Sequence, residues 1–268
     1  MTHPLLRLAG IGLIAGIMLG SSLTLVWAWE SRQPQVVLLA SGHALSTLIT
    51  TPSSRLVIAS GDDPEAFLES LDAYRRPTEK SVDVLLVWGE DDDLTVAETA
   101  AQVLHPEHVY GLTPFARSDE RPSLRGVGVL PDIASIALDA QTDITIHRWP
   151  VGNHDDGRTA WAWEAVVVSS GATVRITSGL APIQDASDAS VLVVAGSHPE
   201  RVWGDQTVVV FADDTLSGRK VRAAAQNAAH PDRVARVFPG DPVVLTLSDG
   251  QIVIADGVTQ PLVLDGTP

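Results

Sequence analysis

A run of four acidic residues, from Glu90 to Asp93, is the stretch of this sequence best suited to metal chemistry. Carboxylates as closely spaced as those of Asp91 and Asp93 could hold a hard cation such as Mg²⁺ or Ca²⁺ through their oxygens. A cation held there could activate a water molecule for hydrolysis. The alternative is a solvated acidic turn, which the positive end of a following helix stabilises. We favour the turn, because no recognised motif ties another acid to this loop.

The histidines do not form a recognisable ligand set. His43 lies in a tight turn, which it would cap, and His154 lies in a polar surface loop that is predicted at 151–159. His105 and His108 are separated by Pro106, which ends a helix and removes any shared face. The sequence also has no G-x-S-x-G, no glycine-rich phosphate loop and no H-E-x-x-H. The acidic run is therefore left as the main candidate for catalysis.

The acidic run lies between a predicted strand and a predicted helix. Val82–Trp88 is short, apolar and β-branched, which favours a strand buried on both faces. Residues from Thr95 to about Leu104 are predicted to be helical, and Thr95–Glu98 has the pattern of a capping box. Loops that leave the ends of buried strands are where α/β folds place their chemistry. The run is thus in a position that suits a site.

Short apolar segments alternate with turn residues over the rest of the chain. Asp63 and Pro64 predict the start of a helix, as N-cap and first helical residue. A hairpin is predicted around Ser170-Gly171, with Trp161 and Trp163 on one face of its first strand. A further helix is predicted from Ser217 to about Ala229. The other predicted strands are 36–40, 45–50, 55–59, 127–130, 133–138, 143–149, 173–177, 189–195, 206–211, 233–238, 241–247, 251–255 and 261–264. Interleaved strands and helices predict an α/β or α+β sandwich with helices on its outer faces.

Composition narrows the function classes. The chain has 268 residues, a formal net charge of −15 and no cysteine. Without cysteine there are no disulfides, no thiol catalysis and no thiolate-bound zinc. A strongly negative field repels phosphate backbones, so we do not expect direct nucleic-acid binding.

The N-terminal segment predicts a membrane anchor. Leu8 to Ala28 contains no charged residue, and a helix of that length spans a bilayer core of roughly 30 Å. Arg7 precedes it and Trp27 and Trp29 end it, an arrangement typical of an interfacial boundary. We expect a short segment at 1–7, a transmembrane helix at 8–29, a linker at 30–34 and a domain at 35–268 outside the cytoplasm. A signal peptide cleaved after residue 28 is the alternative, and it would make the protein secreted and soluble.

Small residues recur along one face of the predicted span. Gly12, Gly16 and Gly20 are four residues apart, a spacing that lets two membrane helices approach closely. Glycine is also common in membrane spans for other reasons. The pattern predicts either a membrane-protein partner or a homodimer through this face.

Several segments match the pattern of a known family in the right order. Residues 36–49 follow the spacing of an opening strand pair, L-D-V-G-Q-G-D-A-x-L-I, and residues 81–93 stand where a strand leads into T-H-x-H-x-D-H. Residues 172–179 stand at a strand ending in T-G-D, 190–198 at D-V-L-K-V-x-H-H-G-S, and 245–250 at a hairpin ending in S-D-G. Over these segments the chain resembles the metallo-β-lactamase-like domain of ComEC-type DNA-internalisation competence proteins. That resemblance implies an αββα sandwich of two mixed sheets flanked by helices, following a transmembrane helix and lying outside the membrane.

Most metal-ligand positions of that family are changed here. The family's enzymes need imidazoles and carboxylates around one or two metals, which activate a water. The aspartate of T-H-x-H-x-D-H matches as Asp93, and the histidine positions fall on Gly89, Asp91 and Leu94. The remaining ligand positions fall on Ala40, Leu45, Leu180, Gly196 and Ser197. His198, beside the lost histidine pair, is either a remnant ligand or, as we favour, an ordinary residue before Pro199.

The expected function follows from these changes. We expect a membrane-anchored metallo-β-lactamase-like domain with no catalytic residues, no cofactor and no metal, acting as a binding or scaffolding module. The resemblance implies an association with a ComEC-type DNA-uptake system. The alternative is a divergent metal-dependent hydrolase, similar to phosphodiesterases or nucleases, that uses the loop from Asp91 to Asp93. Asp91, Asp93 and His198 are the metal-ligand candidates in that case.

Overall fold

The computed structural model describes residues 33–74, 81–89, 94–113, 122–124, 127–153, 159–178, 191–196, 208–212, 234–255 and 262–265. The chain divides into two compact units, Met1–Gln33 and Pro34–Pro268, and the second contains all the strands and helices below. The predicted membrane span at 8–29, with its glycine face, lies outside the described residues. Within the described ranges, no helix is both long and apolar enough to cross a membrane.

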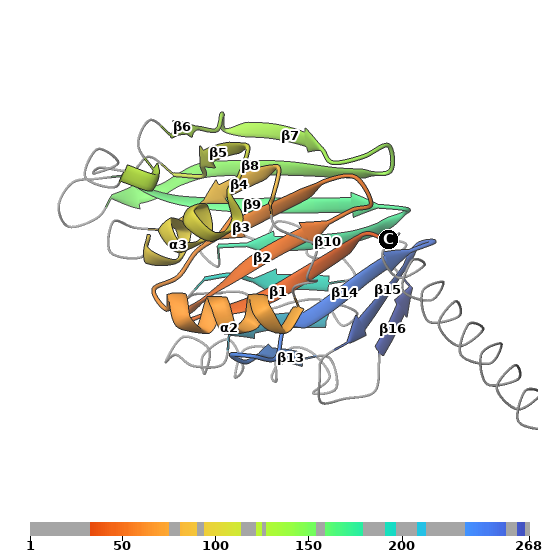
Figure 1. The fold of residues 1–268 in the computed structure, drawn as a ribbon. Helices are drawn as coiled ribbons and strands as arrows, with labels where there is room; N and C mark the ends of the chain where they lie inside the picture. The colour runs from red at the N-terminus through yellow and green to blue at the C-terminus, as the bar shows by residue number, and fades with distance from the viewer. Residues whose placement is uncertain are drawn as a thin grey trace, which may run out of the picture. The chain divides into compact units, whose positions relative to one another are not determined.

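The described strands form two mixed sheets (Figure 1). The first, sheet A, has the order β16-β15-β14-β1-β2-β3-β4-β5-β6. From β16 to β3 its neighbours are antiparallel, and from β3 to β6 they are parallel. Its strands are β1 (Gln35–Ser41), β2 (Ala44–Thr50), β3 (Arg55–Ala59), β4 (Val84–Val87), β5 (His108–Gly111), β6 (Gly128–Val129), β14 (Val243–Ser248), β15 (Gln251–Ala255) and β16 (Leu262–Asp265).

Sheet B has the order β13-β12-β11-β10-β9-β8-β7. It too is divided, with antiparallel pairs from β7 to β10 and parallel pairs from β10 to β13. Its strands are β7 (Ile133–Ala137), β8 (Thr142–Asn153), β9 (Thr159–Ser169), β10 (Ala172–Thr177), β11 (Val191–Val194), β12 (Val208–Ala212) and β13 (Val234–Val237). The long β8–β9 hairpin runs past the start of β7.

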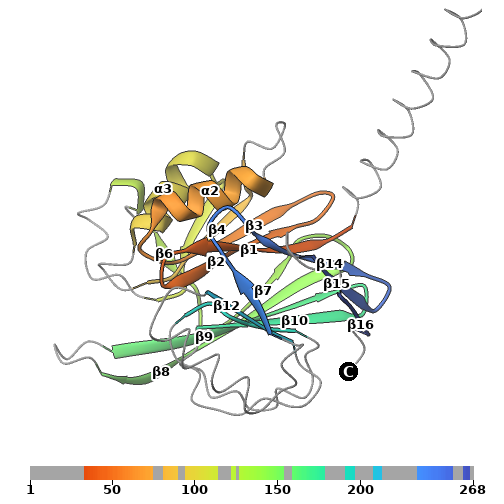
Figure 2. The same ribbon diagram turned by 90° about the horizontal axis from the view of Figure 1, so that it is seen from below.

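Two apolar layers hold the unit together. Alternate side chains of β1 go to opposite faces, so Val36 and Leu38 join the core between the sheets while Val37 and Leu39 join a second core. That second core lies between sheet A and the helices α2 (Pro64–Tyr74) and α3 (Thr95–Leu104), which Figure 2 shows on the outer side of sheet A. Each fully buried aliphatic side chain contributes about 1.5–3 kcal/mol of transfer free energy. A short 3-10 helix, η3 (Pro122–Leu124), packs beside α3 through Leu124.

The N-cap predicted at the start of α2 is confirmed, but the capping box predicted at the start of α3 is not. Asp63 accepts hydrogen bonds at Oδ1 from the amides of Glu65 and Ala66, at 3.1 and 3.0 Å. In α3 the N-cap is Leu94, without a side-chain cap, and Thr95 is already helical. The predicted capping box at Thr95–Glu98 is therefore wrong. The reason is that the Thr95 hydroxyl donates outward, to the carbonyl of Asp62 at 3.3 Å.

The predicted mixed α/β sandwich is confirmed for the described residues. The predicted strands at 36–40, 45–50 and 55–59 and the hairpin at Ser170-Gly171 are present. Two differences stand out: β8 continues to Asn153 where a loop is predicted from 151, and β5 is not predicted at all. The helix predicted at 217–229 lies outside the described residues. The helical cover that the structure describes is thus on sheet A.

Candidate functional site

Strand ends from both sheets meet at one end of the sandwich. The amide of Leu45 in β2 donates to the carbonyl of Ala195, just after β11, at 2.8 Å. Ala195 in turn donates its amide to Thr177 at the end of β10, at 2.8 Å. Trp88, just after β4, donates its amide to Ala59 at the end of β3, at 3.0 Å. We call this end the strand-end rim, comprising residues 40–45, 60–63, 88–89, 94–95, 163, 177–178 and 195–196.

Buried hydroxyl groups fix the β1–β2 turn to the end of β3. The Ser60 hydroxyl donates to the carbonyl of Leu45 at 2.9 Å, and the Ser60 amide donates to Ser46 Oγ at 3.2 Å. Ser41 donates its hydroxyl to the carbonyl of Ala44, at 3.0 Å, across the turn itself. All three serines are fully buried. Because a buried hydroxyl is costly when unpaired, these bonds hold the turn in one conformation.

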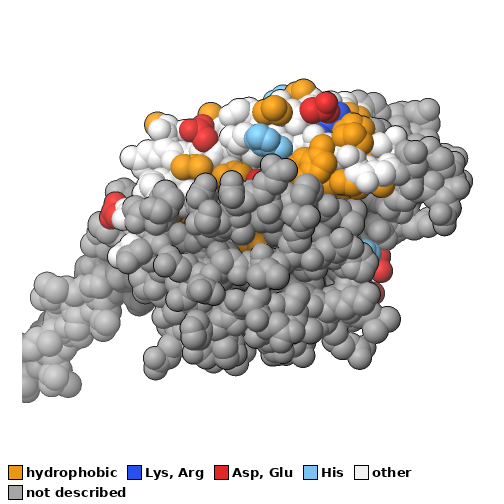
Figure 3. Space-filling model, turned by 180° about the vertical axis from the view of Figure 1, so that it is seen from behind, with side chains coloured by type: hydrophobic (Ala, Val, Ile, Leu, Met, Phe, Trp, Pro, Cys, Tyr) orange, Lys and Arg blue, Asp and Glu red, His pale blue; other side chains and the backbone are white. Residues whose placement is uncertain are grey.

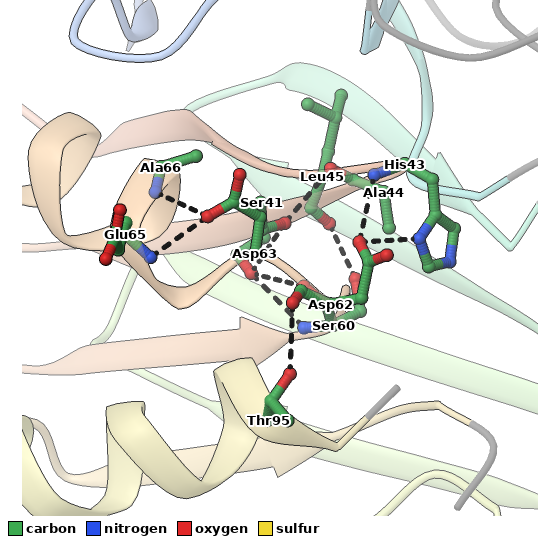
Figure 4. Close-up of polar contacts among 11 residues, drawn as sticks. Ser41, His43, Ala44, Leu45, Ser60, Asp62, Asp63, Glu65, Ala66 and Thr95 are labelled. Carbon is green, nitrogen blue, oxygen red and sulfur yellow. Dashed lines mark hydrogen bonds and ion pairs between the residues drawn. The ribbon is translucent and has the colours of Figure 1, made fainter. Parts of the chain in front are cut away.

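His43 and Asp62 form an ion-pair geometry on this rim (Figure 4). His43 Nδ1 lies 2.7 Å from Asp62 Oδ1, and the His43 amide donates to the same oxygen at 3.3 Å. Partial burial raises the pKa of Asp62, but the two hydrogen bonds from His43 and its imidazole charge outweigh that effect. The pKa of the Asp62 carboxyl therefore lies below its ordinary value. Both side chains are partly exposed to solvent.

Two tryptophans and a glycine pack together at the ends of β4, β10 and β11. The rings of Trp88 and Trp163 meet edge to face, with centroids 5.5 Å apart and planes at 70°. Trp163 is fully buried, and its amide donates to Ser178 Oγ at 3.2 Å. A Cβ at Gly196 would overlap the carbonyl of Ser178 and the ring of Trp88. The ends of β4, β10 and β11 therefore meet in a tightly packed apolar contact.

The described residues at the family's metal-ligand positions cannot bind a metal through their side chains. Leu45, Ala40 and Leu94, which stand at family ligand positions, are buried apolar residues. Gly89 has no side chain, and Gly196 is packed against Trp88. No three His, Asp or Glu side chains lie close enough to hold a metal ion anywhere in the described ranges. We therefore derive no reaction step through a metal.

The sequence-predicted candidates fall in different parts of the chain. Asp91, Asp93 and His198 lie outside the described residues, as do Leu180 and Ser197. His43 is in the β1–β2 turn, as predicted, but its partner Asp62 is not predicted. The signal for that pair is topological, because the β1–β2 turn and the end of β3 lie at the same end of the antiparallel strands β1, β2 and β3. His105 ends α3 in a left-handed conformation, and His108 stacks on Tyr110 in β5.

Comparison with known proteins gives similarity at the level of structure. No protein-family model and no curated protein matches the chain. Among solved structures, Rm3 metallo-β-lactamase is 14% identical, with a TM-score of 0.42 over 64% of this chain and 80% of its own. MEM-A1, a subclass B3 metallo-β-lactamase from a soil metagenome library, is 13% identical, with a TM-score of 0.41 over 64% and 82%. A metallo-β-lactamase of Cronobacter sakazakii is 15% identical, with a TM-score of 0.40 over 80% and 81%.

Proposed function

We propose that residues 35–268 form a metallo-β-lactamase-like sandwich that has lost its metal chemistry and acts as a binding or scaffolding module. The observation that supports this is the packing of Trp88, Trp163 and Gly196 at the strand-end rim. The ligand positions that the resemblance implies include the ends of β4, β10 and β11 and the residues just after them. Where β4 and β11 end, the described chain instead has an indole ring and a glycine that excludes any side chain.

The membrane and competence parts of the proposal rest on the sequence. A helix at 8–29 would hold the domain at the outer surface of the cell membrane. The glycine face at Gly12, Gly16 and Gly20 would pack against a membrane partner or a second copy. An association with a ComEC-type DNA-uptake system would be indirect, since a net charge of −15 disfavours contact with DNA. An N-terminal sequence beginning near Trp29 on the mature protein would contradict the anchor and favour secretion.

A divergent hydrolase is the second candidate, and one contact favours it. Thr95, two residues after Asp93, bonds to the carbonyl of Asp62, whose carboxylate holds His43. The residue two positions after the acidic run is therefore in contact with Asp62, whose carboxylate is paired with the imidazole of His43. Imidazoles and carboxylates are the groups that divalent metals use as ligands.

Metal content of the purified full-length protein separates the two candidates. If the protein is a binding module, we expect mass spectrometry to find less than one equivalent of Zn, Mn or Mg per chain. We also expect no phosphodiesterase activity on model diesters with added metal. A stoichiometric metal, lost together with diesterase activity in an Asp91→Ala/Asp93→Ala variant, would overturn the module and support the hydrolase. The matched control is Asp72→Ala/Glu107→Ala, which removes two exposed carboxylates away from the rim.

A further inference from the structure

Within the described ranges, the edge of sheet B at β7 is unpaired and apolar. β7 has the sequence IASIA, without a charge or a proline, and Ile133 is 67% exposed. Ala134 and Ile136 face the core between the sheets, yet both are only half-buried. Natural sheets usually protect such an edge with charges, proline, a bulge or a covering segment. Figure 3 shows hydrophobic side chains among the described residues of the outer face of sheet B, to which β7 belongs.

The register of β7 on β8 fixes which backbone groups point outward. Ile133 pairs with His147, so Asp132 stands opposite Arg148. The Arg148 amide donates to the Asp132 carbonyl, and the Leu138 amide donates to the Thr142 carbonyl, each at 2.9 Å. The even-numbered residues of β7 therefore bond to β8. In an antiparallel ladder the alternate residues bond the other way, so the N–H and C=O groups of Ile133, Ser135 and Ala137 point away from the sheet.

These outward groups have no backbone partner in the described part of the chain. β7 is the terminal strand of sheet B, and its strand pairing is with β8. Ile133, Ser135 and Ala137 are also exposed at their side chains. Among the described residues the edge is thus an unpaired template for one more antiparallel strand.

We infer that the strand which completes this edge is β7 of a second copy of the chain, antiparallel and centred on Ser135. A twofold interface must be self-complementary, because the same patch is used on both sides. Centring on Ser135 puts Ile133 opposite Ala137 of the second copy, and Ala134 opposite Ile136 of the second copy. A large side chain then faces a small one on both faces of the joined sheet.

The backbone and the charges agree with the same register. With Ser135 opposite Ser135 of the second copy, every outward-pointing residue faces an outward-pointing residue, so the ladder closes along all five positions. Asp132 faces Leu138 of the second copy rather than another acid, so no like charges are directly opposed. A foreign peptide could use the outward groups, but it would need its own matching pattern of large and small residues. The ladder is short, so we expect a weak, concentration-dependent dimer.

Single cysteines test the register, because the chain has no cysteine of its own. In a hydrogen-bonded antiparallel pair the Cα atoms are about 5.5 Å apart, within the range that a disulfide spans. A full-length Ser135→Cys variant is therefore expected to form disulfide dimers under mild oxidation. Ile133→Cys is the matched control, since the two copies of residue 133 would be displaced by four residues, roughly 13 Å along the strand. The double variant Ile133→Cys/Ala137→Cys is expected to cross-link again.

Ser135→Lys tests the interface without a thiol. It puts two like charges at the twofold axis, and it should turn a concentration-dependent dimer, followed by light scattering, into a monomer. Its thermal midpoint at low concentration should stay unchanged, because Ser135 is exposed. Equal cross-linking of Ser135→Cys and Ile133→Cys would overturn the inference, as would a monomer at every concentration. Cross-linking of Ser135→Cys in cells to another polypeptide would instead identify a foreign strand. A dimer that survives Ser135→Lys would place the contact elsewhere, for example at the glycine face.

Discussion

The two ends of the sandwich are closed in different ways. At the end opposite the rim, β9–β10 and β14–β15 are joined by the two-residue turns Ser170-Gly171 and Asp249-Gly250, all with positive φ between 49° and 82°. The amide of Gly250 donates to the carbonyl of Ser170 at 2.7 Å and links the two sheets there. At the rim, long connections follow β10 and β11, and the sheets are linked by Leu45 and Ala195.

The conformation of each end has a different physical origin. The turn end is set by local backbone preference, since two-residue turns with positive φ match the twist of a hairpin. The rim is set by contacts between segments far apart in the sequence, such as Trp88 with Trp163 and Gly61 with Ser41. Substitutions should therefore cost more at the rim than at the turns, and for a different reason.

Gly61→Ala should show the largest effect. Gly61 has φ of 106°, and a Cβ there would also overlap the Ser41 carbonyl. Backbone strain and steric overlap together should lower the free energy of unfolding by about 2–5 kcal/mol. Gly171→Ala should cause backbone strain without steric overlap, because φ is 82° but the nearest atom to the new Cβ would be in ordinary contact at 3.6 Å. We therefore expect it to lower the free energy of unfolding by only about 1–2 kcal/mol. Urea unfolding of both variants measures the difference, and equal losses would contradict the distinction between the ends.

Gly196→Ala isolates the steric part of the rim. The new methyl group would overlap Trp88 and Ser178 without a positive φ, so we expect a loss of about 1–3 kcal/mol. Gly128→Ala is the control, since nothing lies within 4 Å of a Cβ there, and its change should stay within about 0.5 kcal/mol. Tryptophan fluorescence of Gly196→Ala should also change, because Trp88 must move. A silent Gly196→Ala variant would show that the rim is loosely packed.

Asp62→Asn should have the smallest effect. The pKa of Asp62 lies below its ordinary value, so ionised Asp62 stabilises the fold above pH ~4. This contribution is lost as the pH falls through the lowered pKa of the folded state. Because the pair is largely exposed, Asp62→Asn should cost only about 0.2–1 kcal/mol at pH 7, and less below pH ~4. Urea unfolding across this pH range measures the loss of unfolding free energy in Asp62→Asn, with exposed Asp72→Asn as the control. A loss that grows on acidification would contradict the pairing of Asp62 with His43.

Much of the fold could be predicted because its signals are local. Short runs of apolar and β-branched residues predict the strands β1 to β4, and Asp63-Pro64 predicts the start of α2. The turn at Ser170-Gly171 follows from the need for positive φ. β5, with the sequence HVYG, was missed because its exposed His108 and Tyr110 give it no apolar run. Its strand state comes from parallel pairing with β4 and β6, which no local pattern records.

The candidate site could be predicted only in part, for the same reason. Apolar Leu94 and Gly196 at ligand positions are visible in the sequence and argue against a metal. The pairing of His43 with Asp62, and the packing of Trp88 on Trp163, require the sheet order. The capping box was wrong because a tertiary acceptor, the carbonyl of Asp62, takes the Thr95 hydroxyl in place of local helix capping.

The position of β1 inside sheet A, between β2 and β14, has a consequence for the order of folding. On one side it pairs with β2, which follows at once, and on the other with β14, across a separation of 211 residues between Gln35 and Thr246. At ordinary rates of translation, about 10–40 s pass between the synthesis of β1 and that of β14. During that interval β1 is an apolar strand with one unsatisfied edge. The pairing of β1 can therefore be completed only after β14 has been synthesised, and until then its unpaired edge is exposed to aggregation.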